Sequence, residues 1–229
     1  MKLILQALCL SMSATVAFAQ EPMTNWSGGY AGVQFGYLDS DFDHDYSQTF
    51  VTFNSTASLN ASGAQGGLYG GYNWQSSGPW VYGVEGEYNW ADASGNANEV
   101  SSEVSSFPVP LGTYETSIDA TAALRGRVGY ASGRNLFYGT IGMAYIDFKS
   151  RYDNPLPAAP SQDLSDSRIG WTIGVGWERD FGNQWVGRVD YRYSDFGDDT
   201  YLAGSGPPNF KFSGQVNTSE IRVGIARRF

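Results

Sequence analysis

The chain has 229 residues, a formal net charge of −9, 29 glycines and 15% aromatic residues. An acidic chain without basic clusters is a poor candidate for binding nucleic acid, so no nucleic-acid partner is expected. The single cysteine, Cys9, lies near the N-terminus. If this end is removed on export, the mature chain has no thiol, which excludes disulfides and thiol chemistry.

Residues 1–19 are predicted to form a signal peptide, with one domain following from 20 to 229. Lys2 supplies the positive start, and Ala17-Phe18-Ala19 has the small-x-small form of a cleavage site. A membrane anchor is the alternative, but the apolar stretch is short and interrupted by polar residues. After residue 19 no apolar run approaches the ~20 residues of a membrane helix, whereas a barrel strand needs only about 9–11.

Eight segments are predicted to be strands because their side chains alternate between an apolar and a polar face. In chain order they span residues 26–38, 64–74, 80–90, 118–130, 136–146, 169–179, 185–193 and 221–229. In the third segment Tyr82, Val84 and Tyr88 share one face. Glu85 and Glu87 lie on the other face. The first, second and fifth segments are richer in glycine. The sequence does not decide which face of 136–146 points inward.

The connections between these segments alternate between short and long. The short ones are 75–79, 131–135 and 180–184, and the long ones are 39–63, 91–117, 147–168 and 194–219. This order predicts an up-and-down barrel with short periplasmic turns and long external loops. Tryptophans flank the short turns, as an interfacial aromatic girdle requires: Trp74, Trp80, Trp177 and Trp185.

The charges on the polar faces indicate which face is inside. A soluble β-sandwich or a lipocalin-like barrel would turn its apolar residues inward instead. Here the polar faces carry six acids and six bases, a balance suited to a closed interior in which unpaired charge is costly. These twelve residues are the predicted lumen network: Glu85, Glu87, Asp119, Arg125, Arg127, Glu178, Arg188, Asp190, Arg192, Glu220, Arg222 and Arg228. We therefore predict an all-β protein, an eight-stranded antiparallel up-and-down transmembrane β-barrel.

Several motifs resemble those of the eight-stranded outer-membrane barrels that include OmpA-like proteins and the porin-family surface antigens of alphaproteobacteria. They are Trp26-Ser27-Gly28-Gly29-Tyr30-Ala31-Gly32, Gly83-Val84-Glu85-Gly86, Leu124-Arg125-Gly126-Arg127-Val128-Gly129-Tyr130, Tyr191-Arg192-Tyr193 and the ending Ile221 to Phe229. The resemblance covers nearly all of the mature chain. It implies location in the bacterial outer membrane, with the terminal Phe229 as the signal read by the barrel-assembly machinery.

The expected function is a structural, non-enzymatic surface protein whose barrel anchors four acidic loops and contributes to envelope integrity and surface contact. The four long connections carry fifteen acids against four bases, Lys149, Arg151, Arg168 and Lys211. The expected partners are outer-membrane lipid, lipopolysaccharide, and host or surface ligands of the loops. We expect a monomer with neither a cofactor nor a metal site.

Two other functions stay open. The first is a narrow porin-like channel, although eight strands leave an interior that side chains can fill. The second is a lipid-modifying enzyme, for which His44 between Asp43 and Asp45 is the only candidate, without an accompanying serine motif. The same stretch lacks the glycine and glutamate of an EF-hand, which leaves only loose Ca²⁺ binding by its carboxylates.

Overall fold

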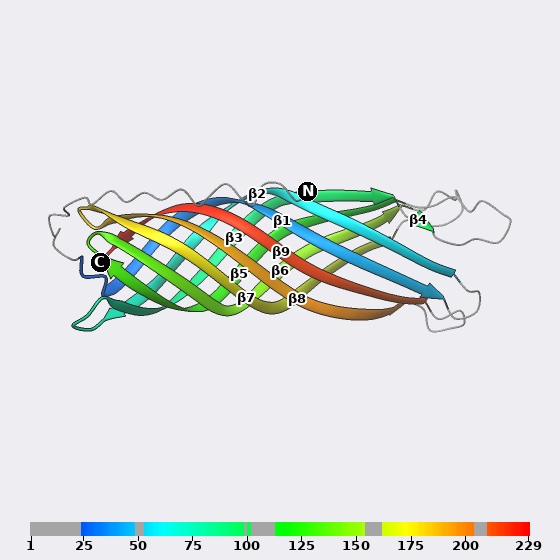
Figure 1. Cartoon of the computed structure of the whole chain (residues 1–229). Coiled ribbons are helices and arrows are strands. Elements are labelled where there is room, and N and C mark those ends of the chain that lie inside the picture. The colour runs from blue at the N-terminus through cyan, green and yellow to red at the C-terminus, as the bar shows by residue number, and fades with distance from the viewer. Residues whose placement is uncertain (1–23, 49–52, 99, 102–112, 154–161, 204–209) are drawn as a thin grey trace, which may run out of the picture.

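The computed structural model describes residues 24–48, 53–98, 100–101, 113–153, 162–203 and 210–229, in which one antiparallel sheet closes on itself (Figure 1). Its eight long strands are β1 (Gly28–Gln48), β2 (Phe53–Gln75), β3 (Trp80–Asn98), β5 (Thr113–Ser132), β6 (Asn135–Asp153), β7 (Gln162–Gly182), β8 (Trp185–Ala203) and β9 (Phe210–Arg228). The two-residue strand β4 (Val100–Ser101) pairs with β2. Each long strand pairs with the next, and β1 also pairs with β9. The predicted eight-stranded up-and-down barrel is confirmed.

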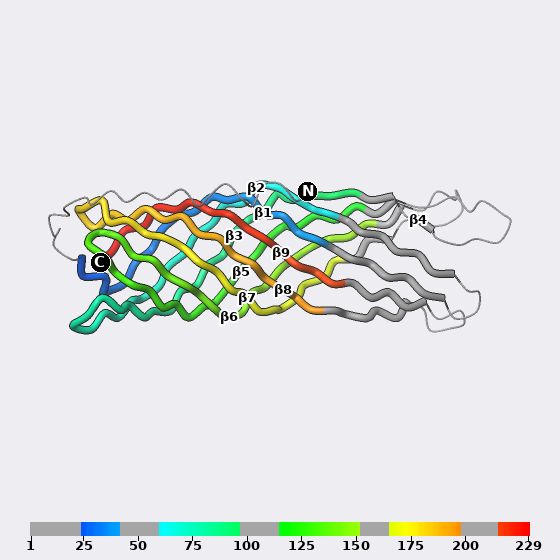
Figure 2. Tube along the Cα trace, in the orientation of Figure 1, coloured from blue at the N-terminus to red at the C-terminus, as the bar shows by residue number. Residues whose placement is uncertain are grey.

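The predicted short connections lie together at one end of the barrel, which we call the turn end. The start of β1 and the end of β9 lie at this same end (Figure 2). Two of these turns contain only two residues, and in the one that joins β7 to β8 both Asn183 and Gln184 have positive φ, as the usual two-residue hairpin turn demands. Within the described ranges no helix is long and apolar enough to cross a membrane.

The strands are longer than the sequence predicts. They contain 19–23 residues each, about twice what crosses a bilayer. The prediction that 39–63 and the other three long connections are loops is therefore wrong for much of their described length. Antiparallel pairing continues there because the backbone N–H and C=O groups of neighbouring strands still form hydrogen bonds with one another. The alternation of apolar and polar side chains is no longer clear in these parts. The barrel wall thus projects well beyond the lipid-facing part.

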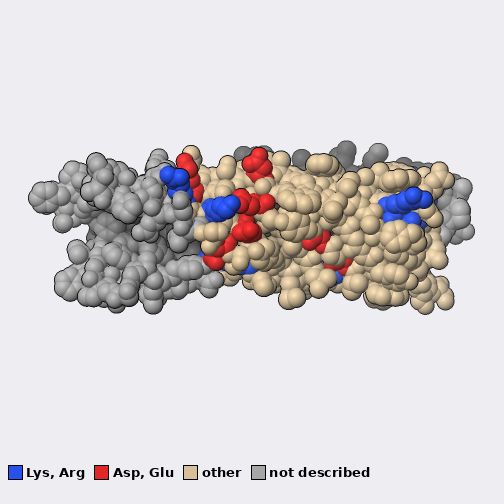
Figure 3. Space-filling model, turned by 180° about the vertical axis from the view of Figure 1, so that it is seen from behind, with Lys and Arg blue, Asp and Glu red and all other residues tan. Residues whose placement is uncertain are grey.

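The outer surface carries large apolar side chains all around the barrel. Their fractional exposure reaches 72% for Ile169 and 68% for Phe35. Every long strand contributes to this band, for example Val33, Leu68, Tyr82, Leu124, Ile141, Val175, Val189 and Val223. On the side shown in Figure 3, a broad zone with few charged atoms separates basic atoms near the turn end from acidic and basic atoms farther along. So large an apolar belt is unsuited to water and indicates a lipid-facing surface.

A β-bulge in β5 reverses the predicted faces of two residues. Ile118 was predicted to face lipid and Asp119 to face the lumen, but the pairing of β5 with β6 shifts between Ile118 and Ala120. The extra residue changes the alternation, so Ile118 is buried inside the barrel and Asp119 lies at the outer surface. Asp119 therefore does not belong to the lumen network.

The inward face of 136–146, left open by the sequence, is the even-numbered one. Leu136, Tyr138 and Ile146 are buried inside, whereas Phe137 and Ile141 face outward. Glycine and threonine at intervening positions weaken the alternation in the sequence, which is why it did not reveal the face.

Candidate functional site

The barrel interior consists of a charged layer between two apolar layers. Near the turn end an apolar cluster lies inside the barrel: Trp26, Val81, Ala131, Leu136, Tyr138 and Val186. Farther from the turn end a second apolar cluster lies inside the barrel: Leu38, Ala61, Ala93, Ile118, Ala123, Ala144, Ile146, Phe148, Phe196 and Val216. The predicted lumen charges gather between these clusters. Most of the charged layer is thus separated from bulk water at both ends.

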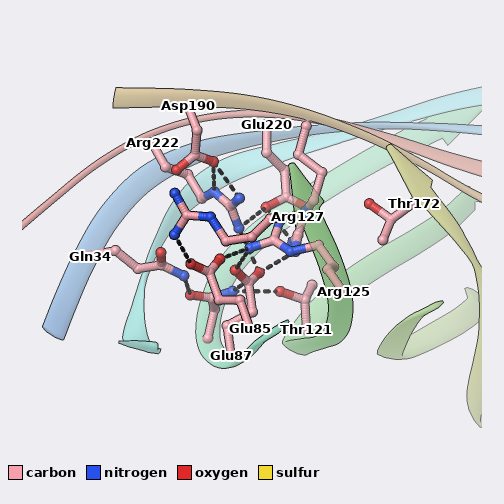
Figure 4. A network of polar contacts seen from close by, with 12 residues as sticks. Gln34, Glu85, Glu87, Thr121, Arg125, Arg127, Thr172, Asp190, Glu220 and Arg222 are labelled. Carbon is pink, nitrogen blue, oxygen red and sulfur yellow. Dashed lines mark hydrogen bonds and ion pairs between the residues drawn. The ribbon is translucent and has the colours of Figure 1, made fainter. Parts of the chain in front are cut away.

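Glu85 and Glu87, neighbours on the inward face of β3, form the centre of the charged layer (Figure 4). Arg125 from β5 bridges them, with its Nη2 atom 2.5 Å from a carboxylate oxygen of each. Arg188 donates to Glu85 over 2.9 Å, and Arg222 donates to Glu87 over 2.6 Å. The side chains of both glutamates are at most 1% exposed, so these guanidinium groups replace the water that a carboxylate otherwise needs.

Strands β8 and β9 contribute the next pairs. Arg192 also pairs with Glu87 and places its Nη2 atom 2.6 Å from Glu220 Oε1. Arg222 binds Asp190 through both Nε and Nη2. Because each cation contacts more than one carboxylate, the charges form a network and not separate pairs.

Arg127 connects the network to the turn-end cluster. It donates to Glu178 over 2.9 Å, and its guanidinium lies 4.1 Å from the ring centroid of Tyr138. Tyr30 donates its hydroxyl to Glu85 over 2.7 Å. Ten of the twelve predicted residues therefore meet in one buried network, with five acids and five bases: Glu85, Glu87, Glu178, Asp190, Glu220, Arg125, Arg127, Arg188, Arg192 and Arg222.

Uncharged side chains complete the network and were not among the predicted site residues. Arg188 donates to Gln34 over 2.7 Å, and Gln34 donates to Asn89 over 2.6 Å. Gln65 donates to Glu220 over 2.6 Å. A signal was present in the sequence, because Gln34 is a lone polar residue between Val33 and Phe35.

Arg228, the eleventh predicted residue, lies away from the network at the turn end. It pairs with Asp180 over 2.8 Å and donates to the carbonyl of Asn25 over 2.7 Å. Thr24 also donates to Asp180, over 3.1 Å. These contacts hold the segment before β1 across the barrel opening, with Trp26 buried beneath it.

Asp119, the twelfth residue, pairs with Lys149 at the outer surface over 2.5 Å, with side chains 41% and 62% exposed. The hydrogen bond to Asp119 raises the pKa of the Lys149 ammonium above its usual value. Arg168 also differs from its prediction, because it faces inward on β7 and lies 5.6 Å from the ring centroid of Phe148. Phe229 is 76% exposed on the outside, and its backbone N–H donates to Gly29.

Two predictions fall outside what the structure describes. The signal peptide, residues 1–19, lies outside the described ranges. The side chain of His44 and those of its acidic neighbours lie outside the described part as well, although their backbone belongs to β1. The structure does describe an open pocket of about 730 Å³ beyond the lipid-facing band, lined by residues that include Glu115, Lys149 and Arg151.

A closed barrel with an apolar belt outside and paired charges inside is an integral membrane barrel of the bacterial outer-membrane class. The family described as outer membrane protein beta-barrel domain matches residues 5–229, and the chain belongs to it. This family assignment supports location in the outer membrane.

Named relatives agree with this assignment. The 31 kDa outer-membrane immunogenic protein of Brucella melitensis is 29% identical over 249 residues, covering all of both chains. The 25 kDa outer-membrane immunogenic protein of Brucella abortus is 32% identical and covers 91% of this chain and 81% of its own. Among solved structures, OprG from Pseudomonas aeruginosa covers 90% of this chain and 97% of its own, with a TM-score of 0.57 and 15% identity. That likeness concerns the fold alone.

Proposed function

We propose that this outer-membrane barrel is a structural surface protein that anchors acidic segments outside the cell and does not conduct solutes. The main support for this proposal is the barrel interior, in which five paired acids and five paired bases lie between two apolar clusters. Eight strands leave a lumen that side chains can fill, whereas general diffusion porins use about 16–18. In such a protein the biological contacts are made by the surface and not by the lumen.

The surface beyond the lipid-facing band supports the same proposal. Described acids on its outer side include Asp39, Asp92, Asp147 and Asp195. We propose that these extracellular parts contact lipopolysaccharide and host or surface ligands, that the protein is a monomer without enzymatic activity, and that Phe229 is read during assembly.

Proteolysis of intact cells tests the proposed topology. Cleavage is expected in the connections opposite the turn end, between β1 and β2, β3 and β5, β6 and β7, or β8 and β9, with the turn at 75–79 protected until the envelope is opened. A matched pair of protease sites, one inserted at 75–79 and one within 102–112, makes the comparison independent of natural cleavage preferences. Cleavage at 75–79 in intact cells contradicts the proposal.

A further inference from the structure

The outer surface at the turn end carries a basic patch consisting of Arg134, Arg179 and Arg227. Arg179 follows Trp177 on the outward face of β7, and Arg227 follows Ile225 on the outward face of β9. Arg134 lies in the turn between β5 and β6, close enough to the next turn that a Cβ on Gly182 would meet its Nη2 atom at 3.2 Å. Figure 3 shows basic atoms gathered at this end.

Strand pairing brings the three arginines to one side of the barrel. Asn135, next to Arg134, pairs with Arg179 across β6 and β7. Arg179 pairs in turn with Gly187 on β8, and Gly187 pairs with Ile225, two residues before Arg227. The basic patch therefore extends over the ends of four adjacent strands.

No carboxylate neutralises the basic patch among the described residues. Glu178 and Asp180, which flank Arg179 in the sequence, point into the barrel and are buried there. The contacts of the patch are to neutral amide oxygens: Arg179 donates to Asn135 over 3.3 Å, and Arg227 donates to Gln184 over 3.4 Å. Each guanidinium has five N–H donors, so donors remain for a ligand.

The surroundings of the patch identify the edge of the lipid-facing band. Aromatic side chains lie exposed beside the arginines: Trp177, Phe181, Trp185 and Phe229. Tryptophan and tyrosine side chains favour the depth of the lipid headgroups, where the phosphates also lie. Arginine binds phosphate oxygens in a bidentate manner and is the side chain suited to them.

We propose that the basic patch is a binding site for the headgroup phosphates of anionic phospholipid, of the phosphatidylglycerol type, in the leaflet at the turn end. The site fixes the depth of the turn end in the bilayer and gives the barrel a lipid preference on that side only. The opposite edge of the band differs, because its outward charges are mainly aspartates such as Asp39, Asp92 and Asp195. The proposal rests on the membrane location and is independent of whether the lumen conducts.

Tryptophan quenching by brominated lipids tests the site directly. The folded mature protein is reconstituted into vesicles of phosphatidylcholine containing brominated phosphatidylglycerol or, in parallel, brominated phosphatidylcholine. Trp177 and Trp185 lie beside the basic patch, and replacing the other exposed tryptophans by phenylalanine leaves these two as the reporters in contact with lipid: Trp74, Trp80, Trp90 and Trp171. A basic residue near an anionic surface is worth about five-fold in affinity. The wild type should therefore bind phosphatidylglycerol at least about five-fold more strongly than phosphatidylcholine, and less so in high salt.

The variant R134Q/R179Q/R227Q should bring the ratio of phosphatidylglycerol binding to phosphatidylcholine binding close to 1. The control Lys149→Gln removes an exposed cation at the opposite edge of the band and should leave this binding ratio unchanged. If the triple variant does not fold, Arg179→Gln alone should lower the ratio about five-fold. Equal binding of both lipids by the wild type overturns the proposal, as does an equal loss of preference in Lys149→Gln. Neither result would affect the intact-cell proteolysis that tests the proposed function.

Discussion

Replacing Glu87 by glutamine removes one negative charge from the centre of the lumen network with little change in shape. Glu87 accepts from Arg125 over 2.5 Å and from Arg222 over 2.6 Å, and it also pairs with Arg192. Its side chain is 0% exposed. The variant leaves five buried arginines with four acids, and breaking a buried ion pair from one side costs about 3–5 kcal/mol. That is a large share of the 5–15 kcal/mol by which a folded protein is typically stable.

The matched control is Asp119→Asn, which removes an acid of the exposed pair with Lys149. Exposed pairs contribute only about 0–1 kcal/mol, because solvent screens them. Both free energies of unfolding are measured by urea titration in lipid vesicles, with tryptophan fluorescence as the signal. The double variant E87Q/R222Q restores equal numbers of charges, and its loss should be about 0.5–3 kcal/mol smaller than the sum of the two single losses. If Glu87→Gln lowers the free energy of unfolding no more than Asp119→Asn does, the buried ion pairs of the network do not stabilise the barrel as proposed.

Three further substitutions test other parts of the structure. Ile141→Arg places a charge in the lipid-facing band and should cost about 2–4 kcal/mol in the same vesicle titration, whereas a neutral result would contradict the assigned outer face. Gly176→Val should impair folding because a Cβ at this position would lie 2.4 Å from the Tyr138 ring. The expected readout is loss of the heat-resistant compact form on gels, and normal folding would show that the interior is less tightly packed. Arg228→Gln breaks the pair with Asp180 and should speed protease removal of residues before β1, while unchanged cleavage would show that the pair does not hold this segment.

Much of the barrel is predictable from the sequence because lipid and lumen impose opposite demands on alternate residues. The clearest case is β3, where Glu85 and Glu87 face inward and Tyr82 and Val84 face lipid, as predicted. The same alternation brought ten of the twelve predicted charges to one interior. Strand number and the short turns followed from the same pattern.

Where the alternation loses its physical cause, prediction fails. Beyond the bilayer both faces of a strand tolerate polar residues. The parts of β1 and β2 that lie away from the turn end are therefore indistinguishable from loops in the sequence. The bulge at Asp119 shifts the faces by one residue, and such a shift depends on pairing with β6, which no local pattern reveals. Apolar residues that close the lumen, such as Leu38 and Ile118, look like lipid-facing residues until the register is known.

The proposed structural role requires a closed lumen. Single-channel recording of the purified, folded protein in planar bilayers measures this directly, with a known porin added afterwards to show that the bilayer reports conduction. The two apolar clusters and the paired charges between them predict no stable openings of the wild type. Stable, ion-selective openings on the nanosiemens scale would contradict a closed lumen and make the channel the better interpretation.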